Sequence, residues 1–182
     1  MIDYEFIAEL EGVGHKAYIP KYNNGRIIGQ SGVTVGKGLD LGNFGDLEKL
    51  NLSYPLIEKL SPYVGLRREL AEQTLEDVPL KLSSAEVKEL NKALMEHHTR
   101  YVKNWYEQES QKEWDKLDPA VQTVIASVLY QYGSPRRVPK FWNYSLGPDV
   151  YCMVKELRDF KDKFPTRRNK EADYLEKNYA CD

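Results

Sequence analysis

Glycine is concentrated in the first quarter of the chain, and this distribution most constrains what the chain can fold into. Of the 12 glycines in the 182 residues, seven lie between Gly12 and Gly38, and two more follow before residue 46. Because glycine occurs where the backbone turns tightly, this quarter is predicted to be a small β-lobe rich in turns. The remainder has the apolar spacing of helices.

The chain is therefore predicted to form one α+β, mostly α-helical domain over residues 1–182. A small β-hairpin lobe is expected over about 12–45 and a helical lobe over about 85–182. Local signals support this. Ser83 and Glu86 form a capping box, Asp3 is a candidate N-cap, Asp118 precedes a proline at a helix start, and Gly133 is expected to stop the helix over 120–132. Helices are expected over 3–11, 44–51, 55–60, 66–76, 85–108, 120–132, 138–143, 149–161 and 167–178, and strands over 16–19 and 31–35, with a turn at 23–25.

Charge and hydropathy exclude several classes of protein. The chain has 26 Lys and Arg against 28 Asp and Glu, whereas nucleic-acid binders usually carry a basic excess. No apolar run approaches the roughly 18 residues of a membrane span. The first residues lack the basic and apolar regions of a secretory signal, which predicts synthesis in the cytoplasm without a leader. Cys152 and Cys181 are expected to be reduced thiols, or one disulfide in an oxidising compartment. No cofactor or metal is expected.

In the segment Ser31–Asp40, two glycines lie between the polar residues Thr34 and Asp40. In an extended run Thr34, Gly36, Gly38 and Asp40 would point to one face, but the first and last would lie about 20 Å apart. That separation is too large for one site, so the chain must bend, and the glycines permit the bend. The pattern predicts a floor open to a bulky substrate. A simple glycine-rich turn with a solvated Asp40 is the alternative.

Glu11 ends the first predicted helix, where the negative end of the helix dipole disfavours an ionised carboxylate. A general acid must be protonated at neutral pH, so Glu11 is a candidate acid. Glu9 is a rival, because a helical wheel places both about equally far from the apolar stripe. Two carboxylates beside an open groove are typical of glycoside hydrolysis. The sequence contains no GxSxG, P-loop or HExxH motif.

Three segments of the chain read LEG at residues 10–12, AYIP at 17–20 and SGVTVGKGLDLG at 31–42. They resemble the pesticin-type muramidases, relatives of the phage-type lysozymes of glycoside hydrolase family 24. The segment TRRNKEA at 166–172 also resembles the Arg-Arg-x-x-Glu-Ala helix that closes many phage-type lysozymes, and the helix ending YQYG at 130–133 adds support. The resemblance implies a lysozyme-like fold and cleavage of peptidoglycan between N-acetylmuramic acid and N-acetylglucosamine.

Matched position by position, the resemblance implies Glu11 as the acid, Thr34 as the water-positioning threonine and Asp40 as the catalytic aspartate. Standard phage lysozymes place the aspartate before the threonine, where this chain has Pro20; here it follows the threonine, as in pesticin. With Thr34 as a water holder, an inverting mechanism is expected. The alternatives are a lytic transglycosylase, which uses the same glutamate, and a catalytically inactive peptidoglycan-binding module.

Several weaker candidates for substrate contact lie elsewhere in the chain. Tyr18, Gln131 and Tyr132 could line a sugar groove, because aromatic rings stack on sugars, and Gly36 and Gly38 would let a substrate approach the backbone. The paired arginines at 67–68, 136–137 and 167–168 are expected to be solvated on the surface.

The expected partners are peptidoglycan glycan strands and, for a delivered toxin, a periplasmic immunity protein. The chain is expected to be a monomer without nucleic acid or a membrane span. It would act in the periplasm or cell wall after release through a phage holin or delivery as a toxin. The sequence leaves open whether it is an endolysin or an antibacterial effector.

Overall fold

The computed structural model describes residues 1–11 and 16–180. Of the described residues, 62% are helical, which confirms the expected α+β, mostly α class and agrees with a lysozyme-like fold. In chain order the elements are α1 (Tyr4–Glu11), β1 (Thr34–Val35), β2 (Leu39–Asp40), α2 (Tyr54–Leu60), α3 (Arg68–Asp77), α4 (Ser84–Ser110), α5 (Pro119–Tyr132), α6 (Pro139–Leu146), α7 (Val150–Arg158) and α8 (Pro165–Asn178).

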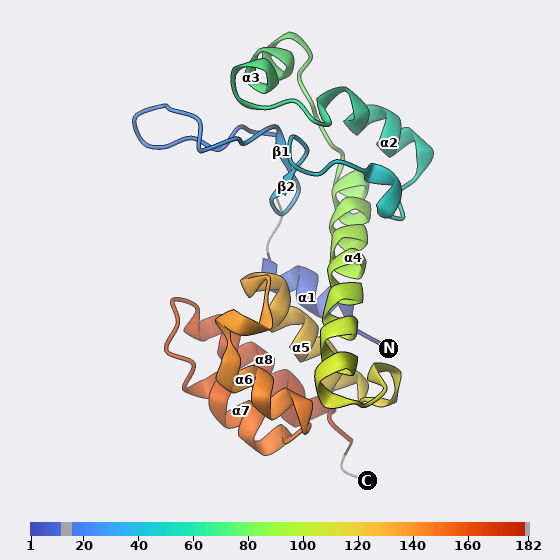
Figure 1. Ribbon diagram of the computed structural model, residues 1–182, viewed down its shortest axis with the longest axis vertical. Coiled ribbons are helices and arrows are strands. Elements are labelled where there is room, and N and C mark those ends of the chain that lie inside the picture. Colours follow the sequence, from blue (N-terminus) through green and yellow to red (C-terminus); the bar gives the residue numbers. More distant parts are fainter. Residues whose placement is uncertain (12–15, 181–182) are drawn as a thin grey trace. The chain divides into compact units, whose positions relative to one another are not determined.

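The chain divides into two compact units, and the division does not follow chain order. The first unit consists of Met1–Leu10 and His98–Asp182, and the second of Glu11–His97. Helix α4 begins in the second unit and ends in the first (Figure 1). The prediction of a single domain with lobes over 12–45 and 85–182 stays a prediction.

Helix α5 is the buried centre of the first unit. Every residue from Ala120 to Leu129 is buried, as expected for a run that is apolar on most sides. Helix α8 packs against both α5 and α7. Asp3 links the N-terminal residues of this unit to α5. Its backbone N donates to Oγ1 of Thr123 at 2.9 Å. Residues far apart in the chain therefore share one core.

Local capping chemistry sets two helix starts where the sequence predicts them. Oδ1 of Asp3 accepts from the backbone N of Phe6 at 2.9 Å, at the start of α1. At α4, the backbone N of Ser83 donates to Oε2 of Glu86 at 2.6 Å, and that of Glu86 donates to Oγ of Ser83 at 3.2 Å. The contact with Ser83 and that with the Lys59 ammonium lower the pKa of Glu86 to about 2. The reciprocal capping box is confirmed.

The ends of α5 also follow the predicted signals. Asp118 is the N-cap, with Oδ1 accepting from the backbone N of Ala120 at 2.7 Å, and Pro119 is the first helical residue. Gly133 follows the last residue with φ of 73° and donates its N to the carbonyl of Leu129 at 2.7 Å. A glycine with left-handed backbone angles directly after the last helical residue commonly ends an α-helix.

The second unit holds a small antiparallel sheet with one apolar face. Val35 pairs with Leu39 across β1 and β2, and the backbone N of Leu41 donates to the carbonyl of Val33 at 2.9 Å. Because alternate residues of a strand face opposite sides, the odd-numbered positions form one face. The side chains of that face are buried in the core of the second unit: Ala17, Val33, Val35, Leu39 and Leu41.

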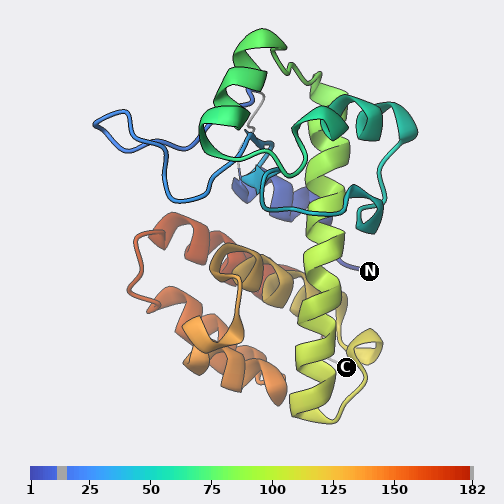
Figure 2. The ribbon, with the colours of Figure 1, turned by 45° about the horizontal axis from the view of Figure 1, so that its top comes forward.

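The turn predicted at 23–25 is confirmed. The backbone N of Gly25 donates to the carbonyl of Tyr22 at 2.9 Å, and its φ is 81°. Lys21 pairs with Ile27 to form a hairpin (Figure 2), and the Lys21 side chain forms an ion pair with Glu72 on α3.

The helix expected over 44–51 is wrong, because only the 3₁₀ turn Leu47–Lys49 forms there. Leu47 and Leu50 are both buried, and three-residue spacing brings them to one side of a 3₁₀ turn. Asp46 caps the turn by accepting from the backbone N of Glu48 at 3.0 Å.

Candidate active site

The pairing of three strand segments places Tyr18, Thr34 and Asp40 in one row. The backbone N of Thr34 donates to the carbonyl of Tyr18 at 2.7 Å, and the backbone N of Tyr18 to the carbonyl of Thr34 at 3.0 Å. On its other side Thr34 lies opposite Asp40. Directly opposite residues project to the same face with Cβ atoms about 5 Å apart. This row, here called the polar row, lies on the face opposite the apolar core of the second unit.

The bend expected at Gly36 and Gly38 is what brings Thr34 and Asp40 together. Their φ angles are 54° and 98°, values that glycine adopts without a steric penalty. The backbone N of Gly38 donates to the carbonyl of Val35 at 3.2 Å. The bend is confirmed, and the separation of about 20 Å for an extended run does not occur.

The two glycines of the bend differ in their surroundings. A Cβ on Gly36 would lie 2.7 Å from Oδ1 of Asn91 on α4, whereas a Cβ on Gly38 would meet nothing within 4 Å. Asn91 also accepts from the backbone N of Lys37 at 3.1 Å. The backbone beside the polar row is therefore open at Gly38, whereas at Gly36 it packs against α4. Substrate contact at either glycine stays a prediction.

The Asp40 carboxylate is held by its own loop. Its Oδ1 accepts from the backbone N of Gly32 at 3.0 Å, of Gly42 at 2.9 Å and of Asn43 at 3.3 Å. Its Oδ2 accepts from Nδ2 of Asn43 at 2.7 Å. Each carboxylate oxygen has two lone pairs, so Oδ1 is fully used and Oδ2 keeps capacity for another donor. Asp40 is half-buried and hydrogen-bonded to its loop, so it is only partly solvated, and its role stays a prediction.

Close backbone packing supports this loop from behind. Cβ atoms on Gly32 and Gly42 would lie 2.4 Å and 2.3 Å from the carbonyl oxygen of Leu66. Nε of Arg67 donates to the carbonyl of Gly42 at 2.9 Å, and the backbone N of Arg68 to that of Ser31 at 2.8 Å. Only glycine fits at the two close approaches. This packing, which sequence reasoning missed, fixes the loop that orients Asp40. Arg67 contributes through its side chain and Arg68 through its backbone N, and both residues are exposed, as expected.

Thr34 is buried, with 3% of its surface exposed. Its hydroxyl donates to the carbonyl of Gly32 over 3.5 Å, a long contact that a better acceptor could replace. Tyr18, at the other end of the polar row, is 48% exposed. The row therefore combines a sheltered hydroxyl, a fixed carboxylate and an accessible aromatic ring.

The two candidate acids on α1 differ in burial. Glu11 is the last residue of α1; it is half-buried, and its Oε1 is shielded from solvent. Glu9 is exposed. A general acid needs a carboxyl group partly withdrawn from water, so this contrast favours Glu11. Gly12, the last residue of the LEG segment, lies outside the described residues.

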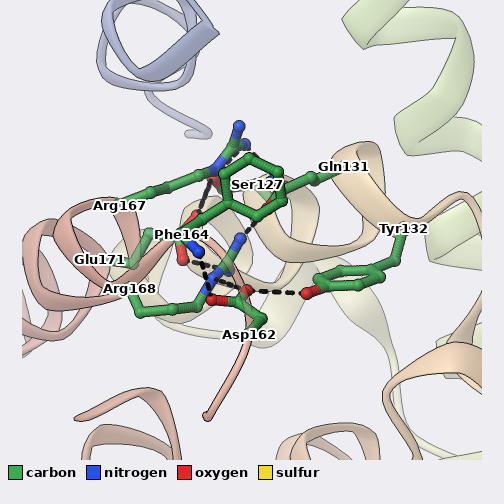
Figure 3. A network of polar contacts seen from close by, with 8 residues as sticks. All are labelled: Ser127, Gln131, Tyr132, Asp162, Phe164, Arg167, Arg168 and Glu171. Carbon is green, nitrogen blue, oxygen red and sulfur yellow. Dashed lines mark hydrogen bonds and ion pairs between the residues drawn. The ribbon is translucent and has the colours of Figure 1, made fainter.

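Gln131 and Tyr132 lie at the end of α5 in the first unit, and both join a polar network there (Figure 3). Gln131 Oε1 accepts from the Arg168 guanidinium. The Tyr132 hydroxyl donates to Oδ2 of Asp162 at 2.7 Å, and burial together with Asp162 raises the pKa of Tyr132 to about 12. Sugar binding by these two side chains stays a prediction.

The expectation that Arg167 and Arg168 are surface residues is wrong. The side chain of Arg168 is 1% exposed and that of Arg167 10% exposed, and both pair with Glu171, which is fully buried. Ser127 donates to Glu171 at 2.5 Å. Burial raises the pKa of Glu171, which the two guanidinium groups oppose. The spacing of two arginines three and four residues before a glutamate is a signal that could have revealed this cluster.

Among the described residues no cluster of His, Cys, Asp and Glu could hold a metal ion. In that same part of the chain, no helix has the length and apolarity that crossing a membrane requires. Cys152 is a free thiol. The disulfide considered between Cys152 and Cys181 involves a residue outside the described part of the chain.

Comparison with families of known proteins gives a match over most of the chain. A family model described as "Pesticin: Bacterial toxin homologue of phage lysozyme, C-term" matches residues 1–149. The matched region contains the polar row and Glu11. Comparison with individual curated proteins gives no match.

Proposed function

Because the chain belongs to the pesticin family of bacterial toxins homologous to phage lysozyme, we propose that it is an N-acetylmuramidase. It cleaves the β-1,4 bond between N-acetylmuramic acid and N-acetylglucosamine in peptidoglycan. The observation that carries the proposal is the pairing of Thr34 with Asp40, fixed by the sheet register within the matched region. No other reaction class is favoured by the residues of this row.

In the proposed mechanism Glu11 protonates the oxygen of the leaving sugar. Its place at the end of α1, half-buried and with Oε1 shielded from solvent, supports this role. Thr34 and Asp40 hold the attacking water, which loses its proton to the Asp40 carboxylate as it adds to the anomeric carbon. The free lone pair on Oδ2 of Asp40 supports this role.

The reaction is proposed to invert the anomeric configuration. Asp40 accepts four hydrogen bonds from its own loop, an arrangement suited to a fixed base and poorly suited to a nucleophile that must approach carbon. A water held between the carboxylate and the sugar attacks from the face opposite the leaving group. Product analysis by NMR at early times tests this. An α-anomer is expected, and a retained β-anomer would overturn inversion.

The activity is tested on purified sacculi with Glu11→Gln as the matched inactive variant. The wild type is expected to release reducing ends, and Glu11→Gln to release none while melting at the same temperature. Full activity of Glu11→Gln would move the acid to Glu9. Anhydro-muramic ends in the mass spectrum would indicate a lytic transglycosylase, and binding without reducing ends an inactive module.

We also propose that the protein acts on the cell wall of target bacteria as a delivered toxin. The family description as a bacterial toxin supports this over a phage endolysin. A producer of such an enzyme would need a periplasmic immunity protein, and co-purification with the products of neighbouring genes tests for it. Elution as a single small species in gel filtration tests the proposed monomer.

A further inference from the structure

Two lysines lie side by side at the edge of the polar row. Lys16 pairs with Lys81 in an isolated antiparallel bridge, and Lys16 is two residues before Tyr18, which forms the next bridge of the same segment. Leu80 and Leu82 are buried in the core of the second unit, so Lys81 between them faces the other side. Lys16, Lys81 and the polar row therefore share one face.

This arrangement is electrostatically unfavourable in the protein alone. Directly opposite like charges destabilise a pair of strands, and both lysines are exposed. Within the described residues, neither Lys16 nor Lys81 forms an ion pair. By contrast, the ammonium group of Lys21, further along the same segment, is paired with Glu72. Residues 12–39 contain no Asp or Glu at all. An anion bound between the two ammonium groups would remove the repulsion.

The nearby carboxylate does not supply this anion. Asp40 lies on the same face, but it accepts from the backbone of Gly32, Gly42 and Asn43 and from the Asn43 side chain. Two residues along a strand span about 7 Å, so the lysine pair lies beside Tyr18 and one row away from Thr34. An anion held there would be attached to the same substrate segment that the polar row contacts.

We propose that Lys16 and Lys81 form a subsite for the carboxylates of the peptidoglycan stem peptide. The inference rests on the proposed muramidase function and specifies which part of the substrate the second unit recognises. The stem peptide branches from the muramic acid next to the cleaved bond and carries free carboxylates, so it combines the right charge with the right position. The subsite would make the enzyme favour peptide-bearing strands over bare glycan.

The test compares Lys16→Gln/Lys81→Gln with Lys88→Gln/Lys92→Gln. The control removes two exposed lysines from adjacent turns of α4 in the same unit, with the same change in net charge. The substrates are Gram-negative sacculi, which carry no teichoic acid, before and after amidase digestion removes the stem peptides. Initial rates give kcat and KM at low and moderate salt.

The Lys16/Lys81 variant is expected to raise KM on intact sacculi about fivefold with kcat unchanged, since two exposed ion pairs are lost. On amidase-treated strands it should equal the wild type, and added salt should reduce the difference. The control should match the wild type on both substrates. An unchanged KM of the Lys16/Lys81 variant on intact sacculi would overturn the subsite. So would an equal rise of its KM on amidase-treated strands, or an equal rise of KM in the Lys88/Lys92 control.

A failure of the muramidase proposal would look different. In that case the wild type releases no reducing ends from either substrate. Sedimentation of the Glu11→Gln protein with intact and treated sacculi then measures the lysine subsite by binding alone. Melting temperatures complete the test: loss of the like-charged pair should leave the melting temperature unchanged or raise it, whereas a structural role would lower it.

Discussion

Replacing Asp40 separates its role in holding the loop from its proposed role in chemistry. Asp40→Ala removes every hydrogen bond that the carboxylate accepts. Asp40→Asn keeps an oxygen that can accept from the backbone of Gly32, Gly42 and Asn43. Its new amide nitrogen, however, faces Nδ2 of Asn43. Two hydrogen-bond donors then face each other at the place where, in the wild type, Nδ2 of Asn43 donates to Oδ2 of Asp40. The two variants therefore differ in how much of the loop they preserve.

The expected stabilities follow from burial. Gly32 and Gly42 are buried, so Asp40→Ala leaves two buried N–H groups unpaired at about 1–3 kcal/mol each. Asn43 is exposed, and water replaces its lost contacts. The free energy of unfolding should fall by about 4 kcal/mol in Asp40→Ala, but by only about 1–2 kcal/mol in Asp40→Asn. At 2–4 °C per kcal/mol for a chain of roughly this size, the melting temperatures should fall by about 12 °C and about 4 °C.

Thermal melts by circular dichroism and sacculus lysis at 20 °C, where both variants are folded, provide the two readouts. Asp40→Asn should lose at least about 100-fold in kcat while remaining nearly as stable as the wild type. Wild-type kcat in Asp40→Asn would refute the catalytic role. A melting temperature of Asp40→Ala equal to that of the wild type, or an equal fall in both variants, would refute the assignment of the loop contacts.

Three further predictions concern stability. Gly42→Ala should lower the free energy of unfolding by about 2 kcal/mol in urea titrations, because the added Cβ would meet the carbonyl oxygen of Leu66. The control Gly45→Ala should leave it unchanged, because its Cβ would have nothing within 4 Å. Equal unfolding curves for the two variants would contradict the close approach at Gly42. Glu86→Gln should destabilise by about 1 kcal/mol at pH 7. Since folding lowers the pKa of Glu86 from 4.5 to about 2, that difference is present above pH 4.5 and should disappear as pH falls toward 2; a difference that persists at pH 2 would contradict it. Arg168→Met should cost about 3–5 kcal/mol at pH 7, because Glu171 loses a buried partner, and less at pH 4, as chemical unfolding at both pH values would show.

Signals carried by neighbouring residues predicted the structure well. The capping box at Ser83 and Glu86 and the stop at Gly133 depend on hydrogen bonds within a few residues, so sequence spacing determines them. The bend between Thr34 and Asp40 was predicted for a different reason. Two polar residues separated by flexible glycines could form one site only if the chain turned back.

The contacts that sequence reasoning missed join distant segments. The donors to Asp40 include the backbone of Gly32, on the far side of the hairpin, and a backbone N–H leaves no trace in the residue types. Arg168 was expected on the surface because arginine usually is. Its partner Gln131 lies 37 positions away, and only the fold brings the two together.

The position of the polar row is determined mainly by the apolar residues beside it. A slip of one residue between β1 and β2 would turn Thr34 toward the core and expose Val33 and Val35, which are both fully buried. Exposing each valine would cost roughly 1.5–3 kcal/mol, so the slipped pairing is strongly disfavoured. No hydrogen bond between the side chains of Thr34 and Asp40 is needed to align them. The apolar core of the second unit therefore sets the geometry in which Thr34 and Asp40 lie opposite each other.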